Sequence, residues 1–195
     1  MARTSPTARR TLPHQVRIIG GTWKRTLLPV LDRPGLRPTP DRVRETLFNW
    51  LGQDLAGWRC VDAFAGTGAL GLEAASRGAA DVLLVEAEGV LVDQLRAVVQ
   101  RLAAEQVRVQ RGNALSVLAT LPAASLDLVF IDPPFESDLF DKALAAARPA
   151  LAGTGFVYLE APSPWAAEAL APHRLELVRH MKAGAVHGHL LRSVA

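Results

Sequence analysis

Four polar side chains stand where apolar runs of this sequence come to an end. Asp62, Glu86, Asn113 and Asp132 each follow a different segment that is predicted to be a buried strand. The carboxyl ends of parallel strands meet at one edge of a sheet, and α/β proteins bind their ligands at that edge. Oxygen atoms there accept hydrogen bonds from ribose hydroxyls, ammonium groups and nucleobase amines. The spacing therefore predicts a single site for a polar, nucleotide-like ligand.

The segment Asp132-Pro133-Pro134-Phe135 is the candidate for chemistry. Its two prolines fix two φ angles and remove two N–H donors, so the segment offers acceptors only, namely the Asp132 carboxylate and the nearby carbonyls. An exocyclic amine of a nucleobase supplies two N–H donors, and Phe135 supplies a face on which the base stacks. The plain structural alternative is a rigid turn at the end of a strand. We expect all four residues to be catalytic.

A glycine turn, Gly66-Thr67-Gly68, follows Asp62 and precedes a predicted helix. Glycines let the backbone approach a ligand closely, while the helix N-terminus points free N–H groups at the same place. With Gly71 and Glu86, the turn also satisfies the dinucleotide-binding fingerprint, so a nicotinamide cofactor is one interpretation. Asp62 favours the other interpretation, because a carboxylate repels pyrophosphate but suits the cationic amino-acid part of S-adenosylmethionine. An ordinary turn is the bland alternative.

We expect several of these segments to contribute to the cofactor site. Glu86 is predicted to accept both ribose hydroxyls, and Asn113 or the backbone beside it to recognise the adenine edge. A loop ending near Thr39 is predicted to cover the cofactor. The expected cofactor-binding residues are Thr39, Asp62, Phe64, Ala65, Gly66, Thr67, Gly68, Glu86, Asn113 and Ala114.

Alternating strands and helices must position these residues, which predicts a mainly parallel sheet with right-handed crossovers. A helix capped by Thr39 is expected to run to about Leu51 and to bury Val43, Leu47, Trp50 and Leu51. The further expected elements are a strand at 60–63, a helix at 69–77, a strand at 82–85, a helix at 90–104, a strand at 107–109, a helix at 116–121, a strand at 126–131, a helix capped by Ser137 and ending at 147, a strand at 156–160, a helix opened by Ser163-Pro164, and a hairpin of 175–181 and 189–194.

Charge is unevenly distributed along the chain. Residues 1–44 carry ten Lys or Arg against two acidic residues, whereas the remainder carries twelve basic and seventeen acidic residues. The net charge is therefore +8 for residues 1–44 and −5 for the rest of the chain. This asymmetry suggests a polyanionic partner, although a solvated basic tail is the simpler alternative. We expect a disordered tail at 1–14, an extension at 15–54 that begins with a small β-hairpin, and the main domain at 55–195.

Composition restricts the class of protein. The 195 residues suit a globular protein with one main core, and no apolar run is long enough to cross a bilayer. A single cysteine, Cys60, excludes a disulfide framework, and no signal peptide is apparent, so we expect a cytoplasmic protein. His187 and His189 have no further ligand at suitable spacing, so we expect no metal site and take both as surface histidines.

Five blocks of the sequence resemble the RsmD-type methyltransferases. They are Arg17-Ile18-Ile19-Gly20-Gly21, Leu36-Arg37-Pro38-Thr39, the segment from Asp41 to Leu51, the segment from Asp62 to Gly71, and Asp132-Pro133-Pro134-Phe135. The resemblance implies a Rossmann-like class I fold with a seven-stranded sheet and an antiparallel last strand. It implies S-adenosylmethionine as cofactor, S-adenosylhomocysteine as product, and methylation of the N2 amine of one guanine, guanine 966 in the usual numbering of 16S ribosomal RNA.

The same resemblance places ribosomal RNA, in an assembling small subunit, against the N-terminal extension. We expect contacts from Arg17, Lys24, Arg25, Arg37 and Arg42, and we expect a monomer without a membrane partner. Pro40 and the two histidines of the last hairpin depart from the family pattern. Three alternatives stay open from the residues alone: an adenine-N6 methyltransferase, a noncatalytic RNA-binding assembly factor, and a nicotinamide-dependent oxidoreductase.

Overall fold

Apolar side chains of the central strands alternate between two helical layers. On β6 (Leu126–Ile131), Leu128 and Phe130 join one buried cluster, whereas Val129 and Ile131 join the other. This period of two is expected for a strand that is covered on both faces.

A computed structural model describes residues 15–33 and 38–194, so the expectations for the tail at 1–14 and for Arg37 lie outside it.

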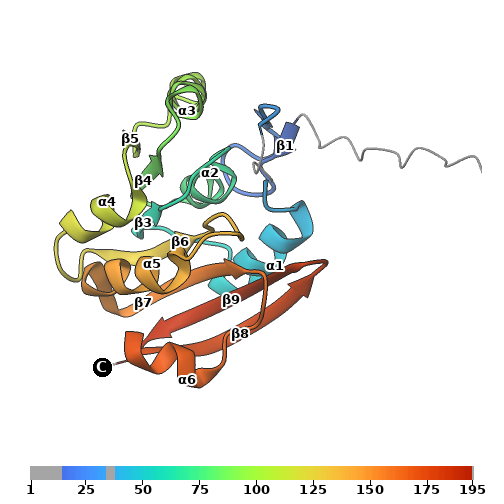
Figure 1. Ribbon diagram of the computed structural model, residues 1–195. Coiled ribbons are helices and arrows are strands. Elements are labelled where there is room, and N and C mark those ends of the chain that lie inside the picture. Colours follow the sequence, from blue (N-terminus) through green and yellow to red (C-terminus); the bar gives the residue numbers. More distant parts are fainter. Residues whose placement is uncertain (1–14, 34–37, 195) are drawn as a thin grey trace, which may run out of the picture.

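Seven strands form one twisted sheet in the order β5-β4-β3-β6-β7-β9-β8 (Figure 1). Strands β3 to β7 are parallel, and β9 runs antiparallel to both of its neighbours, β7 and β8. The expected seven-stranded, mainly parallel sheet with a reversed last strand is confirmed. Besides β6, the strands are β3 (Arg59–Asp62), β4 (Asp81–Glu86), β5 (Val107–Arg111), β7 (Leu151–Ala161), β8 (Leu175–Ala183) and β9 (Val186–Ser193).

Helices cover both faces of this sheet. Helices α1 (Asp41–Leu51), α2 (Ala69–Ser76) and α3 (Gly89–Arg101) pack on the face that carries Phe130. The opposite face is covered by α4 (Ala114–Thr120), α5 (Leu139–Ala147) and α6 (Ala167–Leu170), with short 3₁₀ turns at Arg148–Ala150 and Ala171–His173. Among the described residues, no helix is both long and apolar enough to cross a membrane.

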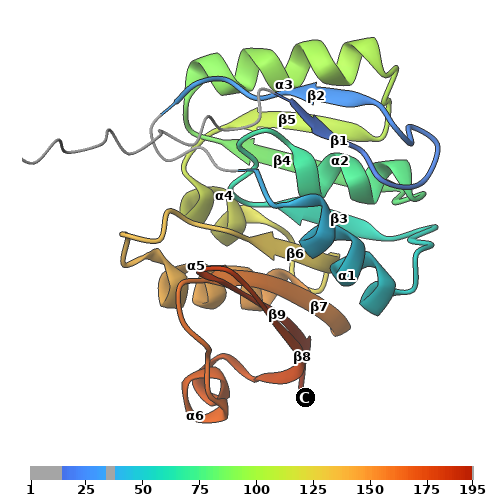
Figure 2. The same ribbon diagram turned by 90° about the vertical axis from the view of Figure 1, so that its right-hand side faces the viewer.

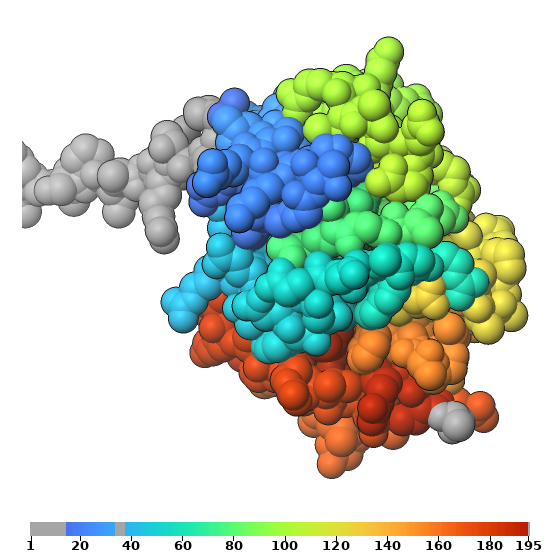
Figure 3. Space-filling model, turned by 180° about the vertical axis from the view of Figure 1, so that it is seen from behind, coloured from blue at the N-terminus to red at the C-terminus, as the bar shows by residue number. Residues whose placement is uncertain are grey.

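The N-terminal extension packs into the first of these layers. Strands β1 (Gln15–Arg17) and β2 (Leu27–Pro29) pair antiparallel, as expected for the hairpin, and lie beside α2 and α3 (Figures 2 and 3). Ile18 and Leu28 are fully buried in the same cluster as Leu72 of α2. Residues 15–33 and 38–54 therefore share one hydrophobic core with the sheet, which ties their position to the rest of the fold.

Several expected boundaries and caps were wrong. Helix α1 begins at Asp41 without a side-chain cap, because Thr39 is buried and its hydroxyl lies beside Glu160 instead. Trp50 is only half-buried, and the buried face of α1 includes Phe48 and a charged residue, Arg44. Helix α5 begins two residues after Ser137, whose side chain bonds back to Pro134, and α6 begins only at Ala167.

Candidate functional site

The carboxyl ends of β3, β6 and β7 bring three carboxylates to one face of the sheet. Asp62 pairs in register with Phe130, and Phe130 pairs with Tyr158. One step further along β6 and β7, Asp132 and Glu160 follow the registered pair Ile131 and Leu159. Period-two alternation puts all three carboxylates on the face that α1 to α3 cover. Sequence reasoning found Asp62 and Asp132 but missed Glu160, which no motif marked.

Asp62 holds the segment after the glycine turn through a hydrogen bond to the backbone. Its Oδ2 accepts a hydrogen bond from the Gly71 backbone N–H at 2.9 Å, and the side chain is 2% exposed. Burial raises the pKa of Asp62 to about 7, with the nearby Glu86 carboxylate contributing in the same direction. The expected cofactor contact of Asp62 is untested, and this carboxyl group already holds the start of α2 in place.

The glycine turn has the close-packed geometry that the sequence pattern indicates. Gly68 has φ +77° at the N-terminus of α2, and a β-carbon there would lie 2.7 Å from Leu95. Gly71 packs against β4, where a β-carbon would come within 2.3 Å of a Leu84 methyl. Both positions therefore exclude larger side chains, and Gly66 is the residue of the turn that stays partly exposed.

Glu86 ends β4 directly beside this turn. Its Oε2 accepts from the Gly66 N–H at 2.9 Å, and its Oε1 accepts from the Glu88 N–H at 2.8 Å. Each carboxylate oxygen has a second lone-pair direction, so the group retains acceptor capacity for two ribose hydroxyls. The residues present thus fit a nucleoside at this edge.

Asn113 has a structural task that the sequence analysis did not assign. Its Oδ1 accepts from the Ser116 N–H at 3.2 Å and caps α4, which begins at the buried residue Ala114. The side chain is exposed, and its amide nitrogen remains available as a donor to an adenine edge.

The segment after β6 forms a tight turn. Pro134 is exposed while Pro133 is buried, and Phe135 is half-buried. The Pro134 carbonyl already accepts from the Ser137 N–H at 2.9 Å and from the Ser137 hydroxyl at 2.6 Å. The acceptors left for a base amine are therefore the Asp132 carboxylate and the carbonyls nearer to it. Burial, together with the carboxylates of Glu160 and Asp62, raises the pKa of Asp132 well above its ordinary value.

Glu160 connects this edge to the N-terminal extension. Its Oε1 accepts from the Tyr158 hydroxyl at 3.0 Å, and the Thr39 hydroxyl lies within reach of the same carboxyl group. Burial raises the pKa of Glu160 to about 6, although Tyr158, Thr39 and the Arg44 guanidinium act in the opposite direction. Thr39, expected to contact the cofactor, thus stands between the extension and the catalytic edge.

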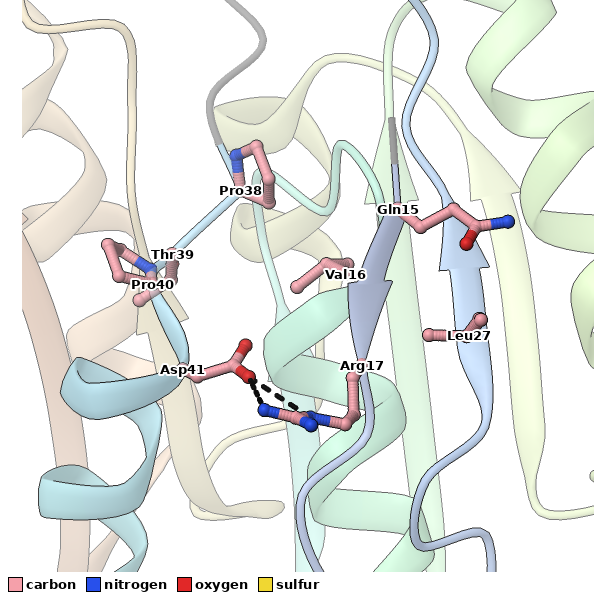
Figure 4. Close-up of a pocket in the computed structure, with 8 residues that line it drawn as sticks. All are labelled: Gln15, Val16, Arg17, Leu27, Pro38, Thr39, Pro40 and Asp41. Carbon is pink, nitrogen blue, oxygen red and sulfur yellow. Dashed lines mark hydrogen bonds and ion pairs between the residues drawn. The ribbon is translucent and has the colours of Figure 1, made fainter. Parts of the chain in front are cut away.

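The expected RNA-binding cations differ in their surroundings. Arg17 forms an ion pair with Asp41 at 2.7 Å beside a hollow of about 490 Å³, which the hairpin and residues 38–41 enclose (Figure 4). Lys24, Arg25 and Arg42 are exposed. Arg37 lies outside the described residues, so no contact is assigned to it.

A buried charged cluster holds the segment Ile19 to Gly21 against α2. Glu73 of α2 accepts from the N–H groups of Ile19 and Gly20, each at 2.8 Å, and pairs with Arg44 at 3.1 Å and Arg77 at 2.8 Å. Gly21 has φ +73°, and a β-carbon there would lie 1.8 Å from the Ser76 carbonyl oxygen. The glycines allow the hairpin turn to dock on α2.

The histidines of the last hairpin are not all on the surface, contrary to expectation. His189 is fully buried; its Nδ1 lies 3.2 Å from the Leu159 carbonyl, and its Nε2 accepts from the Trp165 N–H at 3.1 Å. His187 Nδ1 lies 2.9 Å from His180 Nε2. Within residues 15–33 and 38–194, no group of three or more His, Cys, Asp or Glu side chains suits a metal ion.

Comparison with known proteins identifies relatives along nearly the whole chain. The family model described as conserved hypothetical protein 95 matches residues 16–192. Ribosomal RNA small subunit methyltransferase D of Escherichia coli K12 is 49% identical over 130 residues, which cover 67% of this chain and 65% of the relative. The protein of the same name from Buchnera aphidicola subsp. Baizongia pistaciae is 31% identical, and 92% of each chain is covered.

Solved structures agree with these relatives. A protein from Escherichia coli, provisionally described as a methyltransferase, superimposes with a TM-score of 0.80 at 40% identity, over 93% of this chain and 99% of that one. A protein from Haemophilus influenzae, provisionally described as a methylase, gives a TM-score of 0.76 at 33% identity, with the same coverage of both chains. The chain belongs to the RsmD family of methyltransferases and has their class I, Rossmann-like fold.

Proposed function

We propose that this protein transfers the methyl group of S-adenosylmethionine to the N2 amine of a guanine in 16S ribosomal RNA, in an assembling small subunit. The observation that carries the proposal is the position of Asp132. Its carboxylate, at the end of β6, neighbours the strand that leads into the glycine turn, and the two prolines after it donate no N–H group. The family's named relatives act on small-subunit ribosomal RNA, which supports the choice of substrate.

The chain's own residues hold and orient the reactants. Glu86 and the glycine turn would bind the ribose and the methionine part of the cofactor, which supplies an electrophilic methyl group when bound. A guanine amine is a poor nucleophile because its lone pair is delocalised into the ring. Asp132 would accept one N–H of the amine, favour its pyramidal form, and take the proton released after attack, while Phe135 stacks on the base. The base must first leave its stack.

Nucleoside mapping tests the proposal. Small-subunit particles from cells that lack this enzyme would be incubated with the protein and labelled S-adenosylmethionine, and the RNA would be digested to nucleosides. We expect the label in N2-methylguanosine with the wild-type protein. Label in N6-methyladenosine would instead show that the protein is an adenine-N6 methyltransferase. Binding of the particles without any label would instead support a noncatalytic assembly factor.

A further inference from the structure

Glu160 lies beside Asp132 at the carboxyl ends of β7 and β6, where Glu160 is buried and Asp132 is half-buried. The two residues follow the registered pair Ile131 and Leu159 on adjacent parallel strands, whose backbones are about 4.8 Å apart. Both side chains are on the same face, as Phe130 and Tyr158 are two residues earlier. Glu160 is 3% exposed. The fold therefore places two carboxyl groups side by side where water screens their repulsion poorly.

The surroundings of the two carboxyl groups differ in a way that favours ionised Glu160. Tyr158 donates a hydrogen bond to Glu160 at 3.0 Å, the Thr39 hydroxyl is close, and Arg44 attracts the negative charge. Asp132 has no side-chain donor among the described residues. When one proton is shared by such a pair, the partner with more hydrogen-bond donors and a nearby cation ionises first and raises the proton affinity of the other.

We infer that Glu160 is a positioning residue that makes Asp132 a stronger base for the methyl transfer. The inference deepens the proposed function and rests on it. Because Thr39 precedes α1, the same contact also links the basicity of Asp132 to the docking of the N-terminal extension.

The proton balance shows why this basicity matters. The guanine N2 forms a bond to the methyl carbon as the carbon–sulfur bond breaks, so the sulfonium becomes a neutral thioether and N2 gains a positive charge. Ionised Asp132 takes one N2 proton and leaves a neutral secondary amine. Protonated Asp132 cannot take this proton, and its neutral carbonyl oxygen accepts the N–H more weakly than a carboxylate does. The rate should therefore rise with pH as Asp132 ionises.

The charged and titratable groups near the pair set the pH at which Asp132 ionises, and hence the rising limb of the pH–rate profile. Asp132 faces Glu160 on β7 and Asp62 on β3, and Asp62 in turn is near Glu86 of β4. Glu160 faces Tyr158 on its own strand and Arg44 on α1. Replacing Glu160 removes the neighbour that has the largest charge effect on Asp132 and leaves Asp62 and Glu86 in place.

The test compares pH–rate profiles in single turnovers on small-subunit particles. Glu160→Gln keeps the size and one acceptor for Tyr158 but removes the charge. We expect the midpoint of the rising limb to move to lower pH by about one unit or more, because a like charge beside Asp132 is gone. We also expect a lower plateau rate, since Asp132 is then the weaker base. A merely structural role would lower the rate at every pH without moving the midpoint.

Tyr158→Phe is the second variant, because it removes only a hydroxyl and keeps the aromatic packing. It withdraws a donor from ionised Glu160, so we expect a smaller movement of the limb in the same direction. Midpoints at the wild-type pH in both variants would overturn the inference. Failure of the proposed function looks different, because the wild-type protein would then transfer no methyl group to guanine at any pH.

Discussion

At the scale of single residues, the Glu86 carboxylate both shapes the glycine turn and is proposed to bind the cofactor ribose. It already accepts backbone N–H groups from Gly66 and Glu88, and the proposed cofactor adds two ribose hydroxyls to the same oxygens. The side chain therefore shapes the turn before it binds any ligand. A change at this position should act on cofactor affinity through both routes.

Glu86→Ala should weaken S-adenosylmethionine binding by about 1.5–3 kcal/mol, since hydrogen bonds to a charged acceptor are lost. Glu86→Gln is the matched control, because it keeps one acceptor oxygen and should lose less. Isothermal calorimetry measures both affinities, and circular dichroism checks that the fold is retained. Equal affinity of the wild-type and Ala proteins would remove Glu86 from the cofactor site.

Asp132→Ala should reduce the single-turnover rate by about a hundredfold or more, because Asp132 acts mainly in the transition state. Cofactor affinity should change little. Asp132→Asn keeps an acceptor oxygen but cannot take the proton, so it should retain more activity than the Ala variant. A rate near that of the wild type for Asp132→Ala would show that another group activates the amine.

At the scale of elements, α2 holds the extension through one buried acid. Glu73 has both oxygens occupied by backbone N–H groups of the hairpin turn and by the guanidinium groups of Arg44 and Arg77. Arg77 also lies over the Phe48 ring of α1, 4.7 Å from its centroid. One side chain thus joins the hairpin and α1 to the helix that follows the glycine turn.

Glu73→Ala should lower the free energy of unfolding by roughly 3–5 kcal/mol, since it removes the buried carboxylate that Arg44 and Arg77 share and leaves Arg44 with Asp41 alone as a charged partner. Asp81→Ala is the control, because it breaks an exposed ion pair with Arg108 that should contribute less than about 1 kcal/mol. Urea unfolding measures both values. Similar losses in the two variants would contradict a special role for the Glu73 cluster.

The last hairpin should add a pH-dependent contribution to stability. Burial lowers the pKa of His189 to about 4, below its ordinary value of 6.5. The unfolded chain therefore binds more protons between these values, so this contribution is present above pH 6.5 and is lost as pH falls toward 4.

His189→Gln provides the comparison, because glutamine does not titrate. The stability advantage of the wild-type protein over this variant should shrink from pH 7 to pH 5, as measured by urea unfolding. Asp62 and Glu160, whose raised pKa values act with the opposite sign, are present in both proteins and cancel in the difference. An advantage that does not change with pH would mean that His189 titrates normally.

At the scale of the whole molecule, residues 38–42 of the N-terminal extension border the carboxyl edge of the sheet, because the Thr39 hydroxyl lies beside Glu160. Arg42 is exposed on α1, whereas Arg17 already pairs with Asp41. Arg42→Ala should weaken binding to small-subunit RNA and reduce the log–log salt slope by roughly 0.7–0.9, with cofactor affinity unchanged. Arg17→Ala should have a smaller effect on the slope, because Asp41 competes with phosphate.

Deletion of residues 1–14 is the control for that salt series. We expect the deletion to leave the slope nearly unchanged, because phosphate contacts that orient a target base need fixed geometry. If only the deletion flattens the slope, the RNA surface lies in the tail rather than on the extension.

The sequence by itself determined the fold class and the edge at which the site lies. Period-two and helical patterns identified most of the strands and helices, because side-chain burial follows from local geometry. The glycine turn and the two prolines after Asp132 were equally visible, since glycine and proline constrain the backbone whatever surrounds them.

Only the tertiary structure decided which side chains work together. Glu160 meets Asp132 because β7 lies beside β6, and it meets Thr39 because the extension folds back over the sheet; no local pattern encodes either contact. Arg44 of α1 is buried because its partner Glu73 comes from the next helix along the chain. A charge becomes tolerable in the interior through contacts distant in sequence, so its burial is a property of the fold.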